Sequence, residues 1–105
     1  MNATLRIPLD EKKLGEFCHK WMISELAVFG SVLRDDFGPD SDVDFLATFS
    51  AGAPWNVLHH VHMEDELSAI VGRPVDLVDR GAVEKARNPF RRRSILESAQ
   101  VLHVG

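Results

Sequence analysis

The sequence predicts an α/β (α+β) fold, a small mixed β-sheet flanked by helices. Three short apolar runs with strand character, at 25–29, 42–49 and 74–78, alternate with segments of helical periodicity. The chain has 105 residues, of which 45% are hydrophobic and 27% charged. These proportions are typical of a globular protein, and we expect one domain spanning residues 1–105.

Composition argues against several classes of protein. The lone Cys18 cannot form an internal disulfide and fits a reducing, cytoplasmic setting. There is no run of roughly 18 apolar residues and no charged-then-apolar leader, so neither membrane insertion nor secretion is expected. A formal net charge of -4 argues against direct nucleic-acid binding, although Arg91–Arg93 form a local basic cluster.

The chain is expected to begin with a helix and a buried strand. Asp10 is a good helix cap. The apolar stripe of this helix comprises Leu14, Phe17, Cys18, Trp21 and Met22. The strand over 25–29 ends at Gly30, where a residue without a side chain lets the backbone turn closely. One or two helical turns are expected over 31–36, and residues 37–41 are rich in turn formers.

The middle of the chain combines the clearest strand with a long helix. A loop of small residues at 50–54 separates the strand over 42–49 from a helix over 55–71, which Gly72 ends. The apolar residues of this helix form two groups, Val57, Leu58 and Val61, then Met63, Leu67, Ile70 and Val71. These groups lie on different sides of an ideal helix, so we expect a bend or burial on two faces.

The last third is expected to add a strand and two helices. The strand covers 74–78, and a short helix covers 81–87. An Asn-Pro pair then opens a helix over 88–100. Residues 101–104 could add a short strand at an edge of the sheet.

Three aspartates lie on the predicted strands. Asp42 and Asp44 are separated by one residue, so their carboxylates share one strand face about 7 Å apart and can bind divalent cations together. Asp76 lies between two aliphatic residues of the third strand. If Asp76 shares the face of the other two, a three-carboxylate cluster results, which can hold two Mg²⁺ ions.

A candidate phosphate-binding segment precedes these aspartates. The amides of Gly30 and Ser31, at a helix N-terminus, can hold phosphate oxygens, and Arg34 lies one turn further on with a planar fork of donors. Mg²⁺ ions on the carboxylates can bridge triphosphate oxygens and align an attacking hydroxyl. Phosphoryl transfer depends mainly on such positioning and electrostatics.

Taken in order, these motifs resemble a known family. G-S-V-L-R, S-D-V-D and P-V-D-L-V look like the motifs of the nucleotidyltransferase superfamily of DNA polymerase beta. Within it the chain resembles the minimal nucleotidyltransferases, or MNT proteins, which pair with HEPN-domain toxins in prokaryotic toxin-antitoxin modules. The resemblance spans residues 14–104. One departure is that Asp35 and Asp36 follow Arg34, where many relatives have glycine.

The resemblance implies a fold, a site and an activity. It implies the polymerase beta-like fold, with Gly30 and Ser31 as the nucleotide-phosphate motif. It also implies that Asp42 and Asp44 are metal ligands and that Asp76 is the third catalytic carboxylate. Asp76 would bind the catalytic metal or take the acceptor's proton. The implied activity is Mg²⁺-dependent transfer of AMP from ATP to a hydroxyl of a HEPN toxin, which silences the toxin's RNase site. Because 105 residues leave little room for an acceptor-binding domain, we expect a partner surface to hold the acceptor.

Two metal sites of other kinds can be weighed against this one. Residues 40–44 begin like a calcium-binding loop, but its sixth position is Phe45 instead of glycine and its twelfth is Ala51 instead of glutamate. The predicted helix also carries His59, His60 and His62. They lack cysteine partners and the H-E-x-x-H spacing, which favours a solvated or toxin-facing patch over a zinc site.

Two alternative functions stay open. A non-catalytic antitoxin could neutralise the toxin by binding alone, with the carboxylates as vestiges. A nucleotidyltransferase of this kind could also act on a small molecule or on RNA. Of the remaining features, Arg91–Arg93 are expected to form ion pairs with acidic neighbours, and Cys18 is expected in the core.

Overall fold

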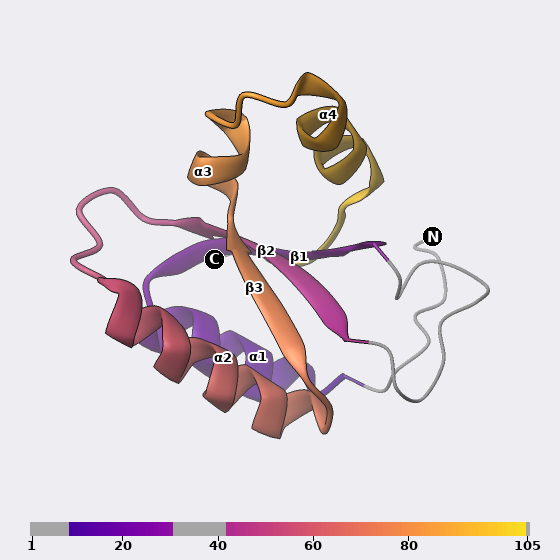
Figure 1. Ribbon diagram of the computed structural model, residues 1–105. Helices are drawn as coiled ribbons and strands as arrows, with labels where there is room; N and C mark the ends of the chain where they lie inside the picture. Colours follow the sequence, from indigo (N-terminus) through magenta and orange to yellow (C-terminus); the bar gives the residue numbers. More distant parts are fainter. Residues whose placement is uncertain (1–8, 31–41, 105) are drawn as a thin grey trace.

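A computed structural model of the chain describes residues 9–30 and 42–104 (Figure 1). In this described part, four strands form one sheet in the order β3-β2-β1-β4. They are β1 (Ile23–Phe29), β2 (Val43–Phe49), β3 (Val75–Asp79) and β4 (Gln100–Val104). Helices α1 (Glu11–Lys20) and α2 (Val57–Val71) lie on one side of the sheet, and α3 (Arg80–Glu84) and α4 (Pro89–Ser98) on the other (Figure 1). The predicted mixed sheet flanked by helices is confirmed.

The sheet is mixed because of how its strands are connected. β1 pairs with β2 and with β4 in antiparallel fashion. β2 and β3 are parallel, and α2 is the crossover between them. Two apolar clusters follow from the alternation of side chains along the strands. The larger contains Phe45 and Leu77 with the inner faces of α1 and α2, and the smaller contains Leu46 with residues of α3 and α4.

Several predicted element boundaries shift by a few residues. The first strand begins at Ile23 instead of Glu25, and the short third helix begins at Arg80 and ends at Glu84. The predicted edge strand is present as β4. The helical turns expected over 31–36 and the turn over 37–41 lie outside the described residues. Across the described ranges, no helix has the length and apolarity needed to span a bilayer.

Met22 does not belong to the buried stripe of the first helix. The helix ends at Lys20, two residues before Met22, and Met22 has a φ of 56°. This left-handed turn directs the Met22 side chain outward, where it is 37% exposed. The other members of the stripe are buried as predicted, namely Leu14, Phe17, Cys18 and Trp21.

The long helix α2 buries one apolar group and exposes the other. Met63 and Leu67 are fully buried against the sheet, whereas Leu58 is 64% exposed and Val57 is 81% exposed. Of the two expectations for this helix, a bend or burial on two faces, burial on two faces is therefore wrong. A helix that lies on one side of a sheet can bury only one stripe, and here the stripe in the second half of α2 is the one used.

Substitutions on the two groups of α2 should have very different effects. Leu67→Ala should lower the free energy of unfolding by about 2–5 kcal/mol, because it removes a fully buried side chain from a packed core. Leu58→Ala should change it by less than about 0.5 kcal/mol. Urea denaturation of the two variants measures the difference. Equal losses would contradict the burial described for α2.

Cys18 lies in the core, as predicted, and its burial sets how stability depends on pH. Desolvation raises the pKa of the Cys18 thiol from 9.0 to about 11. The unfolded chain therefore loses this proton before the folded one, and stability should fall as pH rises from 9 towards 11, by at most about 1.4 kcal/mol per pH unit. Denaturation of Cys18→Ala should show a flatter pH profile over this range. An identical profile would contradict the raised pKa.

Candidate active site

Asp44 and Asp76 lie side by side on adjacent parallel strands. The register of β2 and β3 pairs Asp44 with Asp76 directly. Paired residues of neighbouring strands project to the same face of a sheet, so the expectation that Asp76 shares the face of Asp44 is confirmed. Because Phe45 and Leu77 point into the core with α1 and α2, the two carboxylates point to the side of α3 and α4. Asp44 is half-buried and Asp76 is exposed.

Asp42 lies immediately before β2, with an exposed side chain. The start of β2 is tied to the start of β3, since the N–H of Val43 donates to the carbonyl oxygen of Pro74 at 3.0 Å. All three aspartates therefore belong to the N-terminal ends of the two parallel strands. As the side chains stand in residues 9–30 and 42–104, no three His, Cys, Asp or Glu groups form a metal-binding cluster. The three-carboxylate metal site stays a prediction.

Gly30 brings the end of β1 against Asp44. The register pairs Phe29 with Asp44, so the next residue lies beside the Asp44 side chain. Gly30 has a φ of +73°, and a Cβ placed on it would lie 2.5 Å from Oδ2 of Asp44. The backbone conformation favours glycine, and any side chain at this position would displace the Asp44 carboxylate. The motif glycine and the motif carboxylate, far apart in sequence, are neighbours in the structure.

The remaining members of the predicted nucleotide-binding motif, Ser31 and Arg34, lie outside the described residues. Gly30 is the last described residue before them, and Asp42 is the first after the gap. The two described residues that flank this gap lie near each other's strands, Gly30 beside Asp44 and Asp42 directly before β2. Its predicted role in phosphate binding stays a prediction.

The histidines of α2 have local roles. His59 and Asn56 form a capping box at the start of the helix, with hydrogen bonds of 3.1 and 3.2 Å. Nε2 of His60 lies 2.6 Å from the carbonyl oxygen of Leu77. The rings of His59 and His60 are half-buried, so of the three histidines only His62 is exposed as a solvated patch would require. The cap formed by His59 is a local contact, and the contact of His60 with the edge strand β3 is a tertiary one. The spacing of the histidines indicated neither.

The basic cluster of α4 forms local contacts, partly as expected. Nε of Arg93 pairs with Glu97 at 3.0 Å, which confirms an ion pair with an acidic neighbour. Arg92 donates to the carbonyl oxygen of Ala86 at 3.4 Å. These contacts stabilise the start of α4 and the turn before it.

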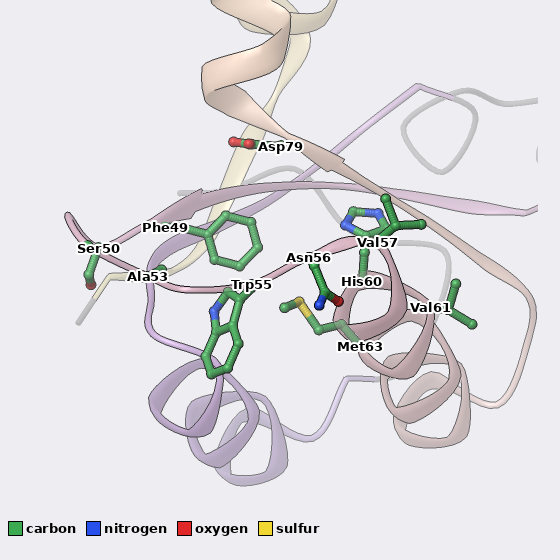
Figure 2. Close-up of a pocket in the computed structure, with 11 residues that line it drawn as sticks. Phe49, Ser50, Ala53, Trp55, Asn56, Val57, His60, Val61, Met63 and Asp79 are labelled. Carbon is green, nitrogen blue, oxygen red and sulfur yellow. The ribbon is translucent and has the colours of Figure 1, made fainter.

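A cavity of about 540 Å³ lies at the C-terminal ends of β2 and β3, where Phe49 and Asp79 line it (Figure 2). It is lined by the end of β2, the loop after it and the start of α2, including Phe49, Trp55, Val61 and Met63. Nε1 of Trp55 donates to the carbonyl oxygen of Trp21 at 2.7 Å, which holds one wall of the cavity in place. Because Asp44 and Asp76 lie at the other ends of their strands, this cavity is separate from the candidate active site.

The arrangement of the sheet and site defines the class of protein. A mixed sheet with two aspartates on adjacent parallel strands, beside a glycine at the end of a third strand, is the framework of a polymerase beta-like nucleotide-transferring fold. The family model described as a nucleotidyltransferase domain matches residues 10–102. The chain belongs to this family.

Two curated relatives have substantial sequence identity with the chain. The Methanocaldococcus jannaschii protein MJ0128, named as a candidate protein adenylyltransferase, is 36% identical over 78 residues, which are 74% of each chain. Protein adenylyltransferase MntA of Thermococcus cleftensis is 35% identical over 69 residues, 66% of this chain and 68% of the relative.

Solved structures share the fold at low sequence identity. A toxin-antitoxin structure with AMP-PNP matches with a TM-score of 0.69 and 16% identity over 92% of this chain and 75% of the other. A tri-AMPylated Shewanella oneidensis HEPN toxin in complex with MNT antitoxin matches with a TM-score of 0.61 and 15% identity, over 90% and 70% of the two chains. At these identities the likeness shows the fold.

Proposed function

We propose that this protein is an antitoxin that transfers AMP from ATP to a hydroxyl group of a HEPN toxin and thereby neutralises it. The observation that carries the proposal is the direct pairing of Asp44 with Asp76, with Gly30 against Asp44. The similarity to protein adenylyltransferase MntA favours a protein as the acceptor. The fold shared with the MNT antitoxin of an AMPylated HEPN toxin favours a HEPN partner.

The donor set of the site fits Mg²⁺. Carboxylate oxygens are the ligands that this cation prefers, and Asp42 and Asp76 are exposed, so a partly hydrated ion can reach them. Asp42, Asp44 and Asp76 would hold two Mg²⁺ ions. When bound, the ions would neutralise charge on the triphosphate and on the departing pyrophosphate.

The chain's own residues would position the reactants. Gly30 and Ser31 would place backbone amides against the phosphates, and Arg34 would add its guanidinium. The acceptor oxygen would bond to the α-phosphorus of ATP while the bond to the pyrophosphate oxygen breaks. The acceptor's proton would pass to a carboxylate oxygen, for which Asp76 is the candidate because its side chain is exposed and an acceptor hydroxyl can reach it.

A transfer assay tests the proposal. The purified protein is mixed with a candidate HEPN partner, labelled ATP and Mg²⁺, and the partner is examined for a mass gain of one or more AMP units. Wild type should transfer label, and the double variant Asp42→Asn with Asp44→Asn should not. If both proteins neutralise the toxin equally and no label moves, neutralisation is by binding alone. Label on RNA or a small molecule, with the toxin unlabelled, would place the activity on another acceptor.

A further inference from the structure

Two side chains of α2 hold the backbone of β3 at Leu77. The N–H of Leu77 donates to Oε2 of Glu64 at 2.8 Å, and Nε2 of His60 lies 2.6 Å from the carbonyl oxygen of Leu77. A carbonyl oxygen only accepts, so Nε2 carries a proton in this contact. His60 and Glu64 are one helical turn apart, and their side chains approach to 3.8 Å. We call these two contacts the Leu77 clamp.

The clamp covers an edge of the sheet. β3 ends the strand order and, in the described part of the chain, pairs only with β2. A residue's N–H and C=O point to the same side of a strand, so Leu77 turns both groups away from β2 while Asp76 turns its own towards β2. The hydrogen bond from the N–H of Val43 to the carbonyl oxygen of Pro74 supports this assignment. Pro74 and Asp76 are two residues apart, so their backbone groups point to the same side of the strand, towards β2. His60 and Glu64 therefore satisfy the groups that a further strand would otherwise pair.

The clamp lies next to a site residue in the chain. Asp76 directly precedes Leu77, and β3 has only five residues. The ladder to β2 restrains Asp76 on one side, and the clamp restrains the following peptide on the other. Because Leu77 is buried towards α1 and α2, His60 and Glu64 lie on that side of the sheet, whereas the Asp76 side chain points to the opposite face. The clamp can therefore act on Asp76 only through the backbone.

We propose that His60 and Glu64 are positioning residues for Asp76, which hold its carboxylate in register with that of Asp44. The inference rests on the proposed function, since it assigns Asp76 a role in binding the metal. Glu64 contributes an ionised acceptor to a backbone N–H, a stronger contact than one between neutral groups. Replacing Glu64 should therefore disturb the position of Asp76 more than replacing His60.

Kinetics of transfer test the proposal with a matched control. Glu64→Ala should lower kcat by about 10- to 100-fold and leave the KM for ATP nearly unchanged, because the clamp restrains a ligand of the metal and does not touch the nucleotide. Glu64→Gln, which keeps an oxygen acceptor for the Leu77 N–H, should recover most of the rate. Asp65→Ala removes the same charge from the next, exposed position of α2 and should have no effect.

A second readout does not depend on the transfer reaction. In Glu64→Ala the amide of Leu77 should exchange with solvent at least about tenfold faster, while the amide of Leu26 in the central strand keeps its protection. The affinity for Mn²⁺, used as a probe of the metal site, should weaken by about 10- to 100-fold. Faster exchange at Leu77 with wild-type Mn²⁺ affinity would overturn the proposal. If wild type transfers no AMP, the proposed function fails, and these two measurements still decide whether the clamp positions Asp76.

Discussion

Gly30→Ala is expected to abolish most AMP transfer while the protein still folds. The φ of +73° costs an alanine about 1–2 kcal/mol, and the new methyl group would meet Oδ2 of Asp44. A carboxylate oxygen is the end of a rotatable side chain, so Asp44 can turn away from the new methyl group without a shift of the backbone. The result should be a displaced metal ligand and a loss of about 10- to 100-fold in transfer rate.

Gly72→Ala is the matched control for this experiment. Gly72 ends α2 with a φ of +78°, and a Cβ placed there would meet no atom within 4 Å. The two variants should therefore lose similar stability, about 1–2 kcal/mol in thermal or urea denaturation, because they share the same backbone strain. Only Gly30→Ala should lose transfer and Mn²⁺ affinity. Equal transfer by the two variants would show that the space beside Asp44 has no role in the reaction.

Asp76→Asn is expected to reduce AMP transfer roughly 100- to 1000-fold without destabilising the fold. Asp44 and Asp76 are directly paired, and like charges at such positions repel by up to about 1 kcal/mol. Removing one charge should therefore leave stability unchanged or raise it slightly in the absence of metal. Thermal denaturation in EDTA and a transfer assay with Mg²⁺ measure the two effects separately.

Asp65→Asn is the control for the loss of one negative charge. Asp65 is exposed on α2, away from the strand ends that carry the aspartates, and its variant should transfer AMP at the wild-type rate. If Asp76→Asn transferred AMP at the wild-type rate, Asp76 would not be part of the active site. A loss in both variants would indicate that net charge, instead of the position of the carboxylate, controls the reaction.

Local signals in the sequence predicted most of the framework. The alternation around Asp44 predicted its strand, and the helix stop at Gly72 is present with the left-handed conformation expected of a terminal glycine. The cap and proline at the start of α4 are also as predicted. In each case the preference is a property of the residue and its immediate neighbours, so it does not depend on how the chain is packed.

Features that depend on packing were not predictable in the same way. The apolar pattern of α2 offered two possible buried faces, and only contact with the sheet decides that Leu67 is inside and Leu58 outside. The contact of Glu64 with Leu77 requires knowing that β3 lies at an edge of the sheet. The approach of Gly30 to Asp44 depends on the antiparallel register of β1 and β2.

The parallel crossover through α2 also has a consequence for the order of events during synthesis. Asp44 and Asp76 become neighbours only after α2 has docked and β3 has added to the sheet, whereas the β1–β2 pair needs no such crossover. Pairings between distant segments form late in folding because a long loop must first close. In a chain on the ribosome that has emerged only as far as α2, Asp44 is therefore present without Asp76 beside it. The site would become active only when the fold is nearly complete.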